Sequence, residues 1–228
     1  MLSYKIKDIY TGKEQEHKRK EKVYKTSYHK KSINKAQYVN KLGLEEDNQS
    51  DKENHGGVDK AICIYTQGAY DFFKEVHGIE FPTCALGENI TLLGCEDKDF
   101  CIGDRFSCGE AIFEITQPRE PCWLISSILG IKKLTALIVK EGKSGFYLRV
   151  IKEGKISKDD EFILLNRTNK DINIEYVNKC YYNAKEHQED IRKILECKEL
   201  SSSYKEALQR RYKNKEFGLE SFQKDKEE

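Results

Sequence analysis

One short segment places a cysteine where a thiol could do chemistry. The segment "ITQPREPCW" (residues 115–123) sets Cys122 directly after Pro121 and three residues after Arg119. Apolar residues at helical spacing follow, and Gly130 is a natural helix end. We therefore expect Cys122 in the first turn of a short helix, with Pro121 at the first helical position. Backbone N–H groups at that end and the nearby arginine favour a thiolate, which could serve as a nucleophile or a soft metal ligand.

A second segment has the residues of a phosphate or cofactor loop. "HGGVDKAI" (residues 55–62) places His55 before Gly56 and Gly57, with Lys60 further on. Two glycines let backbone N–H groups approach a ligand closely, and the lysine adds positive charge for a phosphate. His55 has a side chain suited to proton transfer near neutral pH.

A third segment, "LGENIT" (residues 86–91), contributes Asn89, which could hydrogen-bond a heterocyclic ligand or cap a loop. Each of the three segments also has a purely structural interpretation. Cys122 beside Trp123 could be buried packing, the two glycines a simple turn, and Asn89 a loop cap.

The elements that must position these residues are mostly short strands. β-branched and alternating apolar runs predict strands in "KIKDIYTG", "KVYKTSYHKKSI", "DKAICIYTQ", "CIGDRF", "GEAIFEIT", "SGFYLRVI" and "EFILLNR". A short amphipathic helix is predicted in "AYDFFKEVHG". Many short strands with frequent turns indicate a β-barrel or sandwich over residues 1–169.

After about residue 170 the apolar spacing becomes helical. "HQEDIRKILECKEL" and "SSSYKEALQRRY" both predict helices, and Ser203 with Glu206 three residues later reads as a capping box. Residues 170–228 are therefore expected to form a small helical appendage to a mainly β domain.

Composition limits the classes of protein that fit. The chain has 228 residues, is 35% charged and has a formal net charge of +1, so stable nucleic-acid binding is not expected. It has no apolar run long enough for a membrane helix and no apolar signal segment, which predicts a cytoplasmic protein without membrane contact. The eight cysteines contain no C-x-x-C pair. We expect most of them to be reduced and buried, not to form disulfides or a structural zinc site.

Charge is unevenly distributed along the chain. Residues 13–35 carry nine lysines and arginines against three acids, whereas residues 61–130 carry four against eleven. The basic stretch is either a solvated face or an attraction for an anionic ligand or partner.

Together these motifs resemble those of the MOSC domain family, named after the C-terminal part of molybdenum cofactor sulfurase, and in particular its bacterial YiiM-type members. The resemblance rests on the order and spacing of "HGGVDKAI", "LGENIT", "CIGDRF", "ITQPREPCW" and "SGFYLRVIKEG", and it covers nearly the whole chain. It implies a β-barrel domain followed by a three-helix appendage.

The resemblance also implies a function. Such proteins bind molybdenum cofactor, a pterin dithiolene carrying a phosphate, and not pyridoxal phosphate. They reduce N-hydroxylated compounds, such as hydroxylaminopurines and amidoximes, with electrons from an NAD(P)H-dependent flavoprotein. By this resemblance Cys122 is the metal ligand, and His55 and Arg119 line the pocket beside it. Gly56, Gly57, Lys60, Asn89 and Arg149 are the candidate cofactor-binding residues, and a homodimer is possible.

The sequence departs from the family pattern at two places. Glu46 stands where a glycine is common, and Leu124 stands where a lysine often follows the aromatic residue. One fewer positive charge would affect cofactor affinity or substrate preference more than fold. Three other functions use the same residues: a sulfur carrier with a persulfide on Cys122, a cofactor-binding protein without turnover, and a cysteine–histidine hydrolase.

Overall fold

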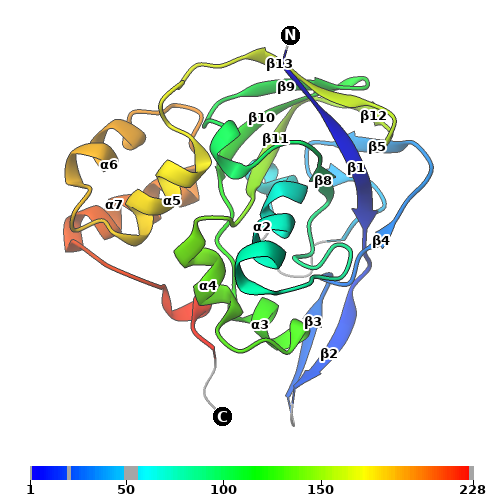
Figure 1. The fold of residues 1–228 in the computed structure, drawn as a ribbon. Coiled ribbons are helices and arrows are strands. Elements are labelled where there is room, and N and C mark those ends of the chain that lie inside the picture. Colours follow the sequence, from blue (N-terminus) through cyan, green and yellow to red (C-terminus); the bar gives the residue numbers. More distant parts are fainter. Residues whose placement is uncertain (1, 20–21, 49–55, 226–228) are drawn as a thin grey trace.

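Seven strands of this chain close into a β-barrel (Figure 1). The computed structural model describes residues 2–19, 22–48 and 56–225. Neighbouring strands pair in the order β13-β9-β10-β11-β7-β8-β1, and β1 pairs again with β13, which completes the barrel. The barrel strands are β1 (Ser3–Thr11), β7 (Ile62–Thr66), β8 (Ile90–Leu92), β9 (Arg105–Cys108), β10 (Ala111–Pro118), β11 (Phe146–Lys152) and β13 (Glu161–Asn166).

One pair of barrel strands is parallel, and this explains the position of the first long helix. β7 runs parallel to β8, whereas the other barrel pairs are antiparallel. Parallel neighbours need a crossover connection, and α2 (Gln67–His77) lies in it. Thr66 caps α2 by accepting a hydrogen bond from the Ala69 N–H, and Gly78 ends it in the left-handed conformation.

Smaller strands extend the barrel. β4 (Lys31–Ser32) pairs with β1, and β12 (Gly154–Ile156) forms a three-stranded sheet with β5 (Gln37–Asn40) and β6 (Gly43–Leu44). β2 (Gln15–Arg19) and β3 (Lys22–Thr26) form a separate hairpin from the basic stretch of the sequence.

Two further helices cover the barrel beside α2. These are α3 (Trp123–Leu129) and α4 (Leu134–Glu141), and short 3₁₀ turns lie at η1 (Val58–Lys60) and η2 (Asp97–Asp99). Along β7, Ile62 and Ile64 face the barrel core, whereas Tyr65 faces a second apolar cluster that includes residues of α2, α3 and α4. β7 is therefore buried on both faces.

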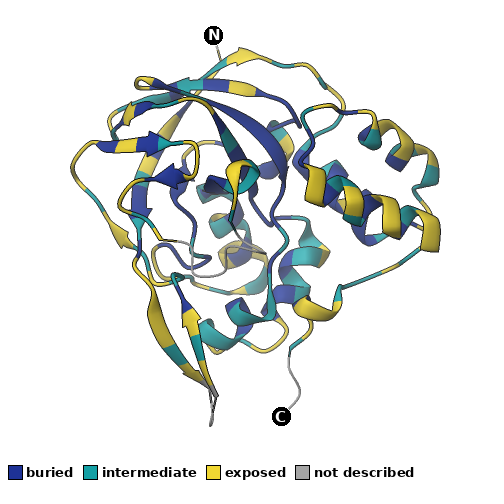
Figure 2. Cartoon of the chain, turned by 180° about the vertical axis from the view of Figure 1, so that it is seen from behind, coloured by how far each residue is buried: buried dark blue, intermediate teal, exposed yellow. Residues whose placement is uncertain are grey.

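The C-terminal helices form a group on one side of the barrel (Figure 1). They are α5 (Ile174–Tyr182), α6 (Gln188–Leu195) and α7 (Ser202–Asn214), followed by η3 (Ser221–Gln223). Their buried residues, such as Val177 and Leu208, belong to the same apolar cluster as the barrel residues Phe106 and Phe146. Figure 2 shows buried barrel strands beside the exposed outer surfaces of α6, α7 and the β2–β3 hairpin.

The predicted β-barrel with a helical appendage is confirmed, and so are most of the predicted elements. Some details were wrong or missing. The cap of α7 is Ser201, whose side chain accepts from the Tyr204 N–H; Ser203 lies inside the helix. The helix α4 was not predicted. Its N-cap is Lys133 in the left-handed conformation, with no side-chain cap, so it lacks the usual start signal.

All eight cysteines are free, and all except Cys122 are buried, as the sequence predicted. Within the described part of the chain, no helix combines the length and apolar character needed to cross a bilayer. The division into domains at residues 169 and 170 stays a prediction.

Candidate active site

The segment that carries Cys122 begins where β10 ends, at Pro118. The next residue, Arg119, donates its backbone N–H to the Gly145 carbonyl at 2.9 Å. A side chain at Gly145 would bring its Cβ within 2.3 Å of the Ile64 carbonyl oxygen, and its φ is +75°. Only glycine therefore lets this turn lie against β7 and hold the start of the segment.

The other end of the segment is held by α4 and by the C-terminus. The Cys122 carbonyl accepts hydrogen bonds from the Thr135 hydroxyl at 2.9 Å and from the Ile125 N–H at 3.2 Å. The Pro121 carbonyl accepts one from the Gln223 side chain at 3.0 Å. Cys122 is the N-cap of α3 rather than a residue of its first turn, so Pro121 lies one position before the cap.

Glu120 joins this segment to the helical appendage. Its carboxylate accepts a hydrogen bond from the Tyr181 hydroxyl of α5 at 2.8 Å. Burial raises the pKa of Glu120, although the hydrogen bond from Tyr181 and the charge of Lys60 lower it. The appendage therefore helps to fix the backbone just before the cysteine.

The thiol of Cys122 is not activated in the way that the sequence suggested. Burial raises its pKa above the usual value, and this effect outweighs the lowering by the Leu124 N–H, Arg119 and the Ile125 N–H. The expected lowering influences are therefore present, but the desolvation of the sulfur was not visible in the sequence. Burial of the sulfur therefore opposes the thiolate that the sequence favoured.

Arg119 is a buried cation with unused donors. The residue is only 7% exposed. Its Nε and Nη1 atoms are buried and make no hydrogen bond to any described residue. Burial alone would lower the pKa of Arg119. The opposing influence of Cys63, Tyr147 and Tyr28 is larger, so the pKa lies above its usual value. Buried guanidinium groups normally have partners, so these donors are suited to an anionic ligand.

Two residues of this neighbourhood escaped the sequence analysis. Cys63 on β7 and Tyr147 on β11 lie opposite each other in the sheet register. Both point away from the barrel core because their neighbours Ile62 and Leu148 point into it. The period-2 alternation of these strands was the available signal. Burial raises the pKa of both groups.

The glycine-rich segment lies near the same neighbourhood through Lys60. The Lys60 ammonium is 5.9 Å from the centre of the Tyr147 ring, and Tyr147 is within electrostatic range of Arg119 and Cys122. Gly57 has a φ of +97° and accepts a hydrogen bond from the Lys60 N–H at 3.0 Å. Gly56 directly precedes this turn, whereas His55 lies outside the described residues.

Asn89 has a structural role. Its side-chain oxygen accepts from the Cys63 N–H at 3.0 Å, and its amide donates to Asp47 at 2.8 Å and to the Tyr10 carbonyl at 3.4 Å. The residue is only 3% exposed. These bonds engage both ends of the amide, which argues against the predicted role of Asn89 as a cofactor ligand.

Arg149 also has partners within the protein. It forms ion pairs with Asp59 at 2.9 Å and Glu114 at 3.2 Å, and it donates to the Glu199 carbonyl at 3.0 Å. Two carboxylates already neutralise its charge, which makes it a poor phosphate ligand. The sequence placed Arg149 correctly on a strand but could not show these partners.

The β2–β3 hairpin packs beside the helix that follows Cys122. The Tyr24 and Trp123 rings meet edge to face with centroids 5.1 Å apart, and His17 Nε2 lies 3.4 Å from the Ser127 hydroxyl. Figure 1 shows the hairpin next to α3. The basic stretch of the sequence thus lies beside the site rather than on a remote face.

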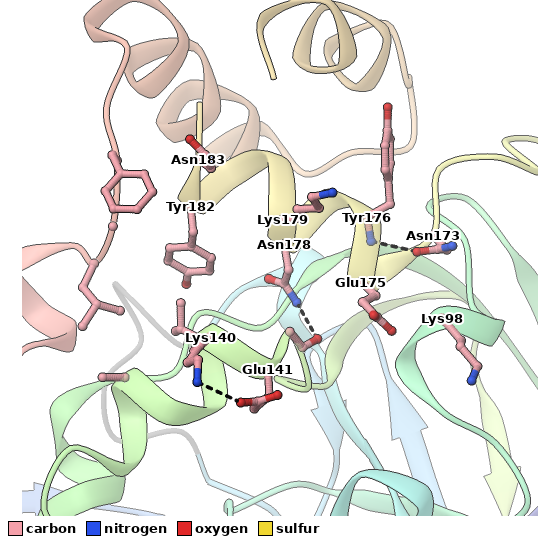
Figure 3. Close-up of a pocket in the computed structure, with 16 residues that line it drawn as sticks. Lys98, Lys140, Glu141, Asn173, Glu175, Tyr176, Asn178, Lys179, Tyr182 and Asn183 are labelled. Atoms are coloured by element: carbon pink, nitrogen blue, oxygen red, sulfur yellow. Dashed lines mark hydrogen bonds and ion pairs between the residues drawn. The ribbon is translucent and has the colours of Figure 1, made fainter. Parts of the chain in front are cut away.

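A separate cavity lies between α4 and the appendage. It has a volume of about 630 Å³ and is lined by residues of α4, α5 and the segment 217–219. Lys140, Glu141 and Asn178 belong to its wall (Figure 3). Cys122 and Arg119 do not line it, so it is distinct from the candidate active site.

Comparisons with known proteins agree with this arrangement. The MOSC domain family matches residues 51–163. The chain is 32% identical to the uncharacterized protein YflK of Bacillus subtilis, over 91% of this chain and 94% of that protein. It is 29% identical to protein YiiM of Escherichia coli, over 90% of this chain and 91% of that one. A protein from Gibberella moniliformis named "Reductase" is 30% identical over a region that covers 50% of this chain and 21% of that protein.

Solved structures show the same architecture. The crystal structure of YiiM from Geobacillus stearothermophilus superimposes with a TM-score of 0.76 at 31% identity, covering 92% of this chain and 99% of that one. The similarity therefore extends over the barrel and the helical appendage together. This chain belongs to the MOSC domain family, among its YiiM-type members.

Proposed function

We propose that this protein is a molybdenum-cofactor-dependent reductase of N-hydroxylated compounds, such as hydroxylaminopurines and amidoximes. The observation that carries the proposal is that Cys122 lies within electrostatic range of Arg119, whose buried Nε and Nη1 donors make no hydrogen bond to a described residue. A soft sulfur donor next to unused cationic donors fits a metal whose own ligands and side groups are anionic.

The residues divide the work of binding. Cys122 supplies the thiolate ligand once the metal charge offsets the burial of the sulfur. Arg119 would donate hydrogen bonds to anionic groups of the cofactor, and Lys60 with the Gly56–Gly57 turn would hold its phosphate. His55 remains the proposed acid. Asn89 and Arg149 act indirectly, since one fixes the start of β7 and the other anchors Asp59.

The overall reaction converts an N–OH group to N–H and releases water, and it consumes two electrons and two protons. The bound molybdenum cofactor would supply the two-electron redox chemistry, and an NAD(P)H-dependent flavoprotein would supply the electrons. The protein's own contribution is to orient the substrate, to keep bulk water from the buried donors and to deliver protons.

The alternative is a sulfur carrier, in which Cys122 holds a persulfide for delivery to a metal–sulfur cofactor. It uses the same thiol but requires no anion site beside it, so the unused donors of Arg119 favour the reductase. The relative named "Reductase" also supports redox chemistry, although the chain matches only part of that protein.

The test is a coupled assay on protein made in a host that synthesises molybdenum cofactor. With a flavoprotein reductase and NADH, the wild type is expected to reduce a hydroxylaminopurine. Cys122→Ser is expected to lose at least about 100-fold of that rate, because a hydroxyl is a poor soft donor.

The control is Cys197→Ser, which removes a thiol from the helical appendage and is expected to keep the rate per folded molecule. Full turnover in Cys122→Ser would refute the reductase mechanism. Labile sulfane sulfur on Cys122 without molybdenum would instead support the carrier function.

A further inference from the structure

A second group of metal-ligating side chains lies in the helical appendage, apart from Cys122. Cys180, His187 and Asp190 each offer one ligand atom, and these three atoms all lie within 4.8 Å of one another. The cysteine is buried and the other two side chains are partly exposed. The group thus has a protected sulfur and an opening toward solvent.

The fold brings these residues together at one helix–helix junction. Cys180 lies near the end of α5, His187 is the N-cap of α6, and Asp190 lies in the first turn of α6. The connecting turn is ordered by hydrogen bonds from the Glu186 and His187 N–H groups to the Asn183 carbonyl, at 3.2 and 3.3 Å. The three ligand positions are therefore fixed by backbone structure on both sides.

The contacts among the three side chains are those of a closed cluster. His187 Nδ1 and Asp190 Oδ2 are 2.9 Å apart. The Tyr176 hydroxyl, one turn before Cys180 on α5, lies close enough to Asp190 and to the Cys180 thiol to lower the pKa of both groups. Figure 3 shows Tyr176 extending from α5 away from Lys140 and Glu141 of the cavity wall. An ordinary helix-end ion pair would explain His187 and Asp190, but it gives no role to the sulfur.

The donor set is that of a zinc-type cation. Sulfur, imidazole nitrogen and carboxylate oxygen together suit a borderline-soft divalent metal, with three protein ligands and one open position. Ligand atoms around tetrahedral zinc are about 3.5 Å apart, given bond lengths of roughly 2.0–2.3 Å. The observed spread thus needs atom shifts of only about 1 Å to reach that geometry.

We propose that Cys180, His187 and Asp190 form a second metal site, which binds Zn²⁺ and fastens α5 to α6. Tyr176 lies beside it as an outer hydrogen-bond donor. The next residue after Cys180 is Tyr181, which holds Glu120 of the active-site segment. Metal at this junction would therefore stabilise the part of the appendage that supports that segment. The proposal is independent of the proposed reductase function.

The experiment uses the full chain with Cys122→Ser as background, so that the active-site thiol does not compete for metal. Metal-free protein is titrated with Zn²⁺ against a chromophoric chelator and with Co²⁺ followed by absorption. We expect one Zn²⁺ per chain, a thiolate-to-cobalt charge-transfer band, and a rise in Tm with added Zn²⁺.

Variants assign the site. Adding Cys180→Ser or His187→Gln is expected to weaken Zn²⁺ binding at least about tenfold and to abolish the rise in Tm. Cys197→Ser is the matched control, a buried thiol in the same appendage outside the cluster, and it is expected to bind like the background protein.

Two results would overturn the proposal. One is the absence of stoichiometric Zn²⁺ binding and of the cobalt–thiolate band in the background protein. This result can be interpreted without any further variant. The other is unchanged affinity in His187→Gln, whose partly exposed side chain makes misfolding a weak explanation. Loss of reductase activity plays no part in this test.

Discussion

At the scale of single residues, the central feature is the buried guanidinium of Arg119, whose Nε and Nη1 atoms make no hydrogen bond to a described residue. Cys63, Tyr147, Tyr28 and Cys122 lie within electrostatic range of Arg119. Burial raises the pKa of each of these neighbours, so they are neutral near pH 7. A cation in such a setting costs stability in the ligand-free protein and gains it when an anion binds.

This reasoning predicts that Arg119→Met separates stability from function. The cofactor-free variant is expected to unfold at the same or higher denaturant concentration than wild type, because an apolar side chain replaces unsatisfied buried donors. It is also expected to lose molybdenum cofactor. Equilibrium denaturation and metal analysis on the same preparations measure both effects.

Arg211→Met is the control for that prediction. Arg211 is equally buried but fully engaged, donating to the Tyr181 carbonyl at 2.6 Å, the Gly218 carbonyl at 2.7 Å and Glu220 at 2.9 Å. Its replacement is expected to cost about 3 kcal/mol or more. Equal destabilisation by the two substitutions would contradict the view of Arg119 as an unsatisfied group.

Sequence reasoning located residues better than it located their partners. Cys122 and Arg119 were identified because prolines and helix signals act locally along the chain. Their neighbours Cys63 and Tyr147 come from strands that pair only in the folded barrel. For the same reason the sequence could not show that Asn89 and Arg149 already have partners, or that burial outweighs the charges that favour a Cys122 thiolate.

At the scale of elements, the N-terminus of α7 shows how well capping residues can be predicted from sequence. The Ser201 hydroxyl accepts from the Tyr204 N–H and donates to the Gln117 side chain, so it links α7 to β10. We predict that Ser201→Ala destabilises the protein by about 1–2 kcal/mol. Ser203→Ala, inside the exposed first turn of α7, is expected to change stability by less than about 0.5 kcal/mol. Denaturant midpoints of the two variants measure this, and a larger cost at Ser203 would contradict the assignment.

A buried carboxyl links η2 to the turn beside Arg119. Asp97 accepts from the Gly145 N–H at 2.8 Å and from the Thr66 hydroxyl at 3.5 Å. Burial raises the pKa of Asp97 to about 6, although the Gly145 N–H and the charge of Lys143 oppose this effect. Between about pH 4 and pH 6 the folded chain therefore binds more protons at Asp97 than the unfolded chain does.

It follows that Asp97 lowers stability as the pH rises through this interval. Relative to Asp97→Asn, the free energy of unfolding of the wild type is expected to fall by at most about 3 kcal/mol between pH 4 and pH 7, since one pKa unit corresponds to about 1.4 kcal/mol. Denaturation of both proteins at several pH values measures the difference between their free energies of unfolding. The contributions of other titrating groups cancel in this difference. A difference that grows in the opposite direction would be inconsistent with a raised pKa.

At the scale of the whole molecule, the barrel and the appendage share one core. Val177, Ile191 and Leu208 from the helices pack in the same apolar cluster as barrel residues such as Phe106 and Ile115. The sequence revealed the change from strand to helical spacing near residue 170, but not this shared packing, because long-range contacts leave no local pattern.

We therefore predict that the full chain unfolds in one cooperative transition. Thermal unfolding followed by far-ultraviolet circular dichroism and by Trp123 fluorescence should give the same midpoint, because the tryptophan lies on α3 and the helical signal comes partly from the appendage. An earlier, separate loss of helical signal would show that residues 170–228 fold independently.

The most direct test of the proposed function is the molybdenum and pterin content of the purified protein. Protein made in a host that synthesises the cofactor is expected to contain molybdenum and pterin in equal amounts, approaching one per chain. Cys122→Ser is expected to lose the metal while keeping its fold. Wild-type protein with neither molybdenum nor pterin, or a Cys122→Ser variant with unchanged molybdenum, would contradict the role of Cys122 as the metal ligand.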